Sequence, residues 1–130
     1  MKKEVFDSNP ILKLSFDFSL MVIDYCEKLE NEKKYVIARQ LLKSGTSIGA
    51  NAMVAQNGKS KADFIHKIKN AAKQTEKLQY WLRLCEYSNK YPGCKELIAK
   101  LKEINKVIGK ILSTAKKRLP FSYLLIYFIF

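Results

Sequence analysis

Two rows of lysines at helical spacing are the residues of this chain whose types and order could do chemistry. In chain order, the rows and the arginine that follows them are Lys69, Lys73, Lys77, Lys102, Lys106, Lys110, Lys117 and Arg118. Like charges four residues apart destabilise an isolated helix by about 0.2–0.5 kcal/mol per pair, so such rows favour an anionic partner. With no Gly-rich loop and few aromatic neighbours, they indicate contact with the phosphate backbone of RNA or DNA at low sequence specificity. A solvated lysine face without a ligand is the alternative.

The charge of the whole chain also favours an anionic partner. Its 130 residues carry a formal net charge of +12, far more than solubility requires. The excess lies late in the chain, since residues 1–30 hold four basic and six acidic side chains, while residues 91–130 hold eight basic and two acidic ones. A protein of this kind favours polyanions such as nucleic acid or an acidic membrane surface.

Residues suited to catalysis or metal binding are sparse. His66 is the one histidine, which argues against a His-based metal site or a His-dependent catalytic triad. The few carboxylates after residue 32 form no inward pair, so we expect no enzyme activity, no cofactor and no metal. The three cysteines lack CxxC spacing and the first residues do not read as a cleavable signal peptide, which together predict a cytoplasmic protein.

The elements that position the lysine rows are organised around a stretch of small residues. One helical face combines positions at steps of three and four, namely Ala38, Leu41, Gly45, Ile48, Ala52 and Ala55. Each interior glycine costs a helix about 1 kcal/mol relative to alanine, so we expect a neighbouring helix to approach this face closely. Trp81 borders the apolar stripe of the following helix. We predict that it is a core residue that packs over the face of small residues.

The hydrophobic pattern predicts four amphipathic helices, at about residues 10–29, 34–56, 61–89 and 94–118. Asn9 followed by Pro10 and Ser60 followed by Asp63 are helix starts, and Gly58 suits a left-handed helix end. Because the connections are short, consecutive helices must be antiparallel neighbours. The sequence therefore predicts an all-α fold, an antiparallel up-and-down four-helix bundle over residues 1–119.

Residues 120–130 form a short hydrophobic tail of β-branched and aromatic side chains. Eleven helical residues reach roughly 16 Å, about half the hydrocarbon thickness of a bilayer, so the tail cannot span a membrane. Docking on an apolar groove, dipping into a membrane and a poorly ordered extension all remain open, and membrane attachment is the least favoured.

The first helix carries a second apolar stripe in addition to the one that joins the bundle. It consists of Leu12, Phe16, Leu20 and Ile23. One stripe suffices for bundle packing, so we expect the second to contact another subunit. Since this helix is net acidic, the basic helices of a neighbour would complement it.

The run of residues 38–51, the segment 59–67 and the Tyr80-Trp81-Leu82 triplet together resemble the four helix bundle proteins, also called the large-subunit ribosomal RNA intervening-sequence proteins. The residues that carry the signature or the helix packing are Ser44, Gly45, Ser47, Ile48, Gly49, Asn51, Ala52 and Trp81. The resemblance covers about residues 9–118 and implies a basic protein that assembles into a homo-oligomeric ring or barrel, expected to be a pentamer.

The accessory proteins of diversity-generating retroelements look like relatives, which implies nucleic acid and a reverse transcriptase as partners. Val54 and Gln74 stand where the family usually has glutamates, so the surface is more basic than usual. The alternative function is a structural or adaptor protein that binds a protein partner, with incidental positive charge.

Overall fold

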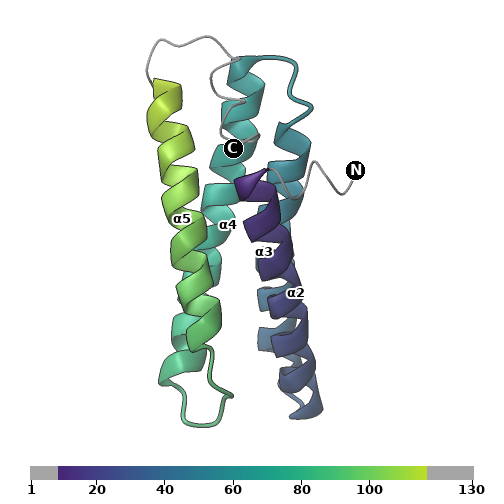
Figure 1. Cartoon of the computed structure of the whole chain (residues 1–130). Coiled ribbons are helices and arrows are strands. Elements are labelled where there is room, and N and C mark those ends of the chain that lie inside the picture. The colour runs from purple at the N-terminus through teal and green to yellow at the C-terminus, as the bar shows by residue number, and fades with distance from the viewer. Residues whose placement is uncertain (1–8, 117–130) are drawn as a thin grey trace.

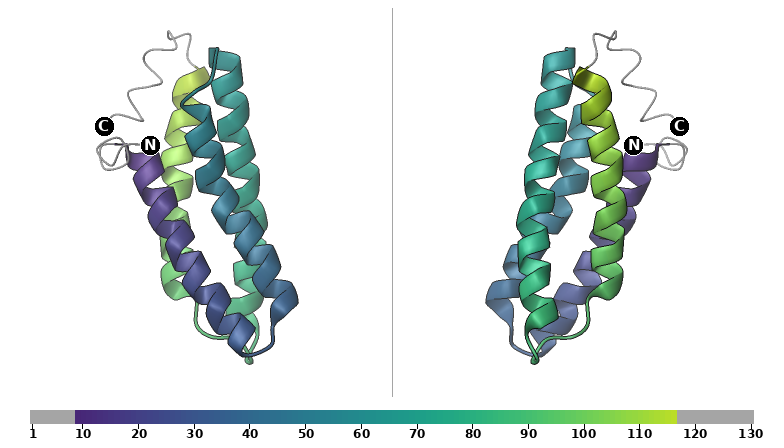
Figure 2. Two further views of the ribbon diagram at one scale, coloured as in Figure 1. Left: turned by 90° about the vertical axis from the view of Figure 1, so that its right-hand side faces the viewer. Right: turned by 90° about the vertical axis from the view of Figure 1, so that its left-hand side faces the viewer.

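The computed structural model describes residues 9–116, and these form four helices and no strand. The helices are α2 (Pro10–Asn31), α3 (Tyr35–Ala55), α4 (Lys61–Tyr87) and α5 (Lys95–Lys116). Their long axes run side by side and their connections lie at alternating ends (Figures 1 and 2). The predicted antiparallel up-and-down four-helix bundle is therefore confirmed. Lys117, Arg118 and the tail at 120–130 lie outside the described residues.

The two predicted helix starts are confirmed. The Asn9 side chain accepts a hydrogen bond from the backbone N–H of Leu12 at 3.2 Å, and Pro10 occupies the first helical position. At the start of α4 the Ser60 hydroxyl accepts from the Asp63 N–H at 3.1 Å. The Asp63 carboxylate accepts in turn from the backbone N–H of Lys59 at 3.3 Å, one residue earlier than in a standard capping box.

The left-handed conformation predicted at Gly58 is wrong. No glycine among residues 9–116 has a positive φ, and the one non-glycine residue there that does is Lys33, at 64°, in the turn after α2. After Ala55 the chain continues in a tightened right-handed turn, in which the Gly58 N–H donates to the Ala55 carbonyl at 3.0 Å. This bond satisfies one of the last helical carbonyls, so no left-handed residue is required.

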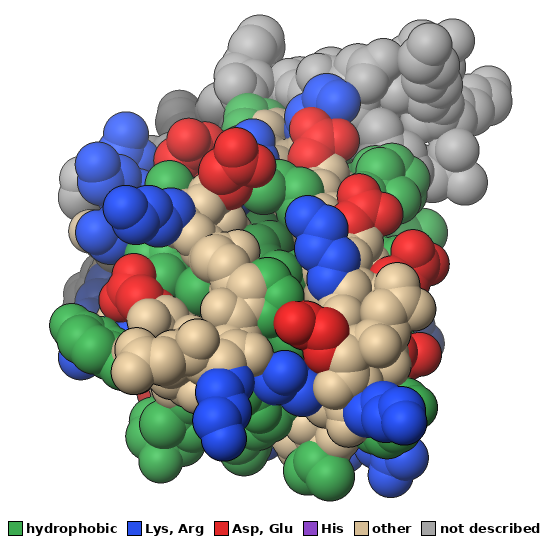
Figure 3. All heavy atoms as spheres, turned by 90° about the horizontal axis from the view of Figure 1, so that it is seen from below, with side chains coloured by type: hydrophobic (Ala, Val, Ile, Leu, Met, Phe, Trp, Pro, Cys, Tyr) green, Lys and Arg blue, Asp and Glu red, His purple; other side chains and the backbone are tan. Residues whose placement is uncertain are grey.

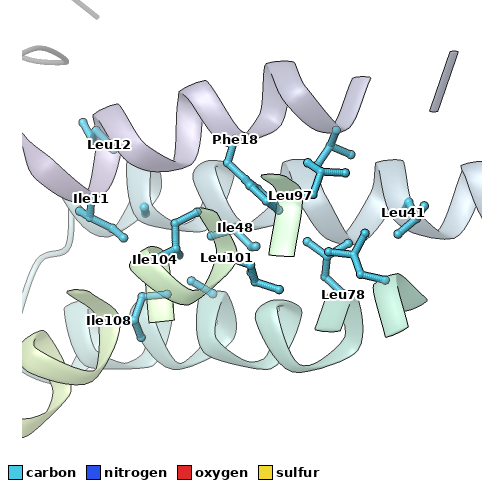
Figure 4. Close-up of a cluster of buried hydrophobic side chains, with 14 of the residues drawn as sticks. Ile11, Leu12, Phe18, Leu41, Ile48, Leu78, Leu97, Leu101, Ile104 and Ile108 are labelled. Atoms are coloured by element: carbon cyan, nitrogen blue, oxygen red, sulfur yellow. The ribbon is translucent and has the colours of Figure 1, made fainter. Parts of the chain in front are cut away.

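All four helices contribute to a single hydrophobic core (Figure 4). Phe18 of α2, Ile48 of α3, Leu78 of α4 and Ile104 of α5 are each completely buried. Burying an aliphatic or aromatic side chain of this size contributes roughly 1.5–3 kcal/mol. The face of small and apolar residues predicted for α3, from Ala38 to Ala55, is buried in this core.

The close helix approach predicted at the small residues of α3 is present, and its partner is α2. A β-carbon added at Gly45 would lie 2.8 Å from both γ-carbons of Val22, and one at Gly49 would lie 3.3 Å from the Ser15 hydroxyl. Ala52 is also buried. The glycines therefore give α2 room, rather than giving room to Trp81 on α4.

Candidate nucleic-acid interface

The α4 row of lysines lies on the outer surface of the bundle. Lys69, Lys73 and Lys77 are all exposed, because the buried side of α4 is occupied by its apolar stripe. Residues four apart are separated by about 6 Å along a helix axis, so the row extends over roughly 12 Å. Within residues 9–116, none of these lysines forms an ion pair with a carboxylate.

The α5 row is also exposed where the structure describes it. Lys102, Lys106 and Lys110 are exposed, while Lys117 and Arg118 lie outside the described residues. Lys77 lines a groove between α3 and α4, whereas Lys102 lines a groove between α4 and α5. The last lysine of the α4 row therefore faces α3, and the first lysine of the α5 row faces α4.

The sequence reasoning did not include Arg83. It lines the α4–α5 groove with Lys102, so it adds positive charge there, partly offset by Glu86. Arg83 does not continue the four-residue spacing of the α4 row. Its place at the α4–α5 groove could have been inferred only from its spacing relative to the buried residues of α4.

Ion pairs in the described part of the chain involve other lysines. Lys13 pairs with Asp17 at 3.1 Å on α2, and Lys100 pairs with Glu103 at 3.9 Å on α5. Seen from the end that carries the α2–α3 and α4–α5 connections, basic and acidic side chains are interspersed (Figure 3). Lysines outside the two rows, among them Lys33, Lys34 and Lys90, also have no carboxylate partner within residues 9–116, so what distinguishes the rows is their regular spacing.

Trp81 departs from its prediction as a core residue. It is only partly buried, packs against the edge of the core and lines the α3–α4 groove beside Ser44. Its ring meets that of Tyr80 edge to face, with centroids 5.7 Å apart and planes at 69°.

The remaining signature residues act in packing between helices. Ser44, Gly45, Ile48 and Ala52 are buried. The Asn51 side-chain amide donates to the Ser47 backbone carbonyl at 2.8 Å, and the Ser47 hydroxyl donates to a carbonyl of the same helix. These polar groups therefore find the partners that a close contact requires within α3 itself.

The second apolar stripe of α2 is exposed except at its start. Phe16, Leu20 and Ile23 are 49%, 49% and 38% exposed. Leu12 is 1% exposed, so its assignment to an intersubunit contact is corrected: it belongs to the core of the protomer. Phe16 borders an apolar groove between α2 and α3 that reaches Met53.

The three cysteines are buried free thiols. Burial raises the pKa of Cys26 and of Cys94 to about 11, and it also raises the pKa of Cys85. Burial likewise raises the pKa of Tyr25, whose hydroxyl donates to the Pro92 carbonyl at 2.8 Å. Neutral, enclosed thiols are poor nucleophiles, so they act here as small core residues.

Residues 9–116 contain neither a cluster of metal ligands nor a helix suited to crossing a membrane. No group of three or more His, Cys, Asp or Glu side chains in that range is placed to hold a metal ion. None of its helices combines the length and the apolar character that crossing a bilayer needs.

Comparisons with known proteins agree with this architecture. The family model described as 23S rRNA-intervening sequence protein matches residues 7–113. A crystal structure at 1.70 Å of a protein of unknown function from the S23 ribosomal protein family of Bacteroides thetaiotaomicron is similar, with a TM-score of 0.73 and 34% sequence identity. The similarity covers 78% of this chain and 97% of that one. A search of the curated proteins finds no match.

Proposed function

This chain belongs to the 23S rRNA-intervening sequence protein family, and from that premise we propose that it is a non-enzymatic, self-associating protein that binds the backbone of RNA or DNA with low sequence specificity. The observation that carries the proposal is the α4 row, Lys69, Lys73 and Lys77, exposed and without a paired carboxylate in the described chain. Three neighbouring like charges on one helix are unfavourable until an anion neutralises them.

Contact through phosphates alone has a definite salt dependence. Each phosphate that a lysine neutralises on a single strand contributes about −0.7 to the slope of log K against log salt concentration. Three such contacts predict a loss of roughly twentyfold in affinity between 50 and 200 mM salt.

The test is binding of a fluorescent 20-nucleotide RNA by the wild type and by the triple variant Lys69→Glu, Lys73→Glu, Lys77→Glu. We expect the variant to lose binding while its helical circular dichroism is unchanged, because the three side chains are exposed. A matched control replaces Lys13, Lys28 and Lys33 by glutamate, which changes the net charge equally on and after α2. If both triple variants lose RNA binding to the same extent, overall charge rather than the α4 row is responsible for binding.

We further propose that the exposed apolar stripe of α2, Phe16, Leu20 and Ile23, contacts a second copy of the chain. These side chains and the adjoining apolar groove would otherwise leave a hydrophobic surface in water. α2 carries more acidic than basic side chains, which suits contact with a basic neighbour. This supports the assembly expected from the family resemblance.

Sedimentation velocity at micromolar concentration tests this contact. The wild type is expected to sediment as an oligomer, and Phe16→Glu as a smaller species. Tyr87→Glu, at an exposed aromatic near the end of α4, is the control and should sediment as the wild type does. A monomeric wild type would refute the assembly.

The reverse transcriptase partner implied by the resemblance stays a prediction. Salt-insensitive capture of a polypeptide, with no affinity for RNA or DNA, would favour the adaptor function in its place.

A further inference from the structure

An amphipathic groove of about 540 Å³ lies between α3 and α4, at the end of the α4 lysine row. Its principal groups are a lysine and an amide from each helix and two adjacent aromatic rings, namely Gln40, Lys43, Gln74, Lys77, Tyr80 and Trp81. Its volume is in the range typical of small-ligand sites. The groove therefore combines cations, amides and aromatic rings in one place.

The adjacent aromatic rings of Tyr80 and Trp81 form a platform at the groove. Tyr80 is 61% exposed, although it is a large ring that would gain by burial. Trp81, which is partly buried, contacts it edge to face, with the ring centroids 5.7 Å apart. The exposed Tyr80 ring can stack on a flat partner.

The charges around this platform favour an anion. Lys77 lies one turn before Trp81 on α4, and Lys43 faces the same groove from α3. Glu76 is the one carboxylate that lines the groove, so a net positive charge remains. Lys69 and Lys73 extend the positive row away from the groove along α4.

Gln40 and Gln74 add hydrogen-bond donors and acceptors, which can pair with the edge of a base. A base within a duplex cannot reach such a platform, because both of its faces are stacked on neighbouring base pairs. Single strands, in contrast, offer unstacked bases that aromatic side chains bind.

We propose that the α3–α4 groove takes an unstacked base of single-stranded RNA or DNA on Tyr80, with the flanking phosphates on Lys43 and Lys77. This inference rests on the proposed function and adds to it a preference for single strands. It also gives Tyr80 a role that backbone contact alone does not require.

Trp81 supplies the assay, because it is the one tryptophan of the chain and adjoins the platform. Oligouridylate of ten nucleotides is titrated into the full-length protein, and the fluorescence of Trp81 is followed. An RNA duplex of ten base pairs is the comparison ligand. We expect quenching by the single strand and weaker binding of the duplex.

Three single variants test the platform itself. Tyr80→Leu removes the ring and is expected to weaken single-strand binding by about five- to hundredfold, the range measured for one stacked base. Tyr80→Phe keeps the ring and should bind as the wild type does. Tyr87→Leu removes a more exposed tyrosine of the same helix that does not line the groove, and should also be unchanged.

Four results would overturn the inference. If Tyr80→Leu binds the single strand as the wild type does, while the Lys69, Lys73, Lys77 variant does not, the backbone contact stands and the base site falls. Equal affinity for strand and duplex has the same consequence. If Tyr80→Leu alters sedimentation instead of binding, the ring belongs to a subunit contact. Absence of any nucleic-acid binding removes both proposals.

Discussion

Replacing Gly45 by alanine tests how closely α2 and α3 approach each other. A β-carbon there would lie 2.8 Å from both γ-carbons of Val22, whereas one at Gly109, inside α5, would meet nothing within 4 Å. Alanine is favoured over glycine in a helix interior by about 1 kcal/mol at either site. Gly109→Ala should therefore raise the free energy of unfolding by about 1 kcal/mol.

At Gly45 the same gain is opposed by a steric clash. Val22 is 1% exposed and β-branched, so it cannot rotate out of the way. Overpacking of this kind costs about 1–3 kcal/mol. The net effect of Gly45→Ala thus ranges from about neutral to roughly 2 kcal/mol destabilising, and the two alanine variants should differ by about 1–3 kcal/mol.

Urea unfolding followed by circular dichroism measures both variants, at one protomer concentration because self-association shifts apparent stability. Adding Val22→Ala to Gly45→Ala should relieve the clash, giving a favourable coupling energy of about 0.5–3 kcal/mol in a double-mutant cycle. If Gly45→Ala stabilises the protein as much as Gly109→Ala does, the helices are not in close contact there and the reasoning is refuted.

Three further predictions concern the caps and the buried polar groups. Asn9→Ala should lower the free energy of unfolding by about 1 kcal/mol through loss of the α2 cap. Asn9→Asp keeps a capping oxygen and should retain most of the wild-type stability. Equal stability of the two variants would contradict a capping role for Asn9. Tyr25→Phe should cost about 1 kcal/mol in chemical denaturation, because the partly buried Pro92 carbonyl loses its donor; no change would show that water replaces it. Burial raises the pKa of Cys26 and Cys94 from 9.0 to about 11, so their neutral thiols favour the folded state below pH 9, and this contribution is lost as pH rises toward 11. The urea midpoint should fall less between pH 8 and pH 10.5 in the double variant Cys26→Ala, Cys94→Ala than in the wild type. An identical fall in the two proteins would contradict a contribution from these thiols.

The helices and the core were predictable from the sequence because both depend on local signals. Asn9 and Ser60 are strong caps, and the apolar residues repeat at a period that only a helix can bury on one side. The close approach at Gly45 was predictable for the same reason, since an interior glycine needs a neighbour. Which neighbour it faces was not, because α3 has a helix on each flank and its own pattern does not distinguish them.

The rotation of a helix explains two of the differences at the surface. Each step of four residues turns by about 40° around the axis, so a row at this spacing drifts sideways. Leu12 therefore lies in the core while Phe16 and Leu20 of the same row are exposed. By the same drift the α4 row ends with Lys77 in the α3–α4 groove, a position that the sequence spacing alone did not predict.

The slope of binding against salt tests the central claim most directly, that exposed lysines of α4 neutralise nucleic-acid phosphates. Affinity for a 20-nucleotide RNA is measured between 50 and 300 mM salt for the wild type and for a variant with Lys69, Lys73 and Lys77 replaced by alanine, which removes the three charges without adding repulsive ones. The wild type is expected to give a log–log slope of about −2 or steeper, and the variant a slope shallower by about 2. Equal slopes for the two proteins, or wild-type binding that does not change with salt, would contradict the account.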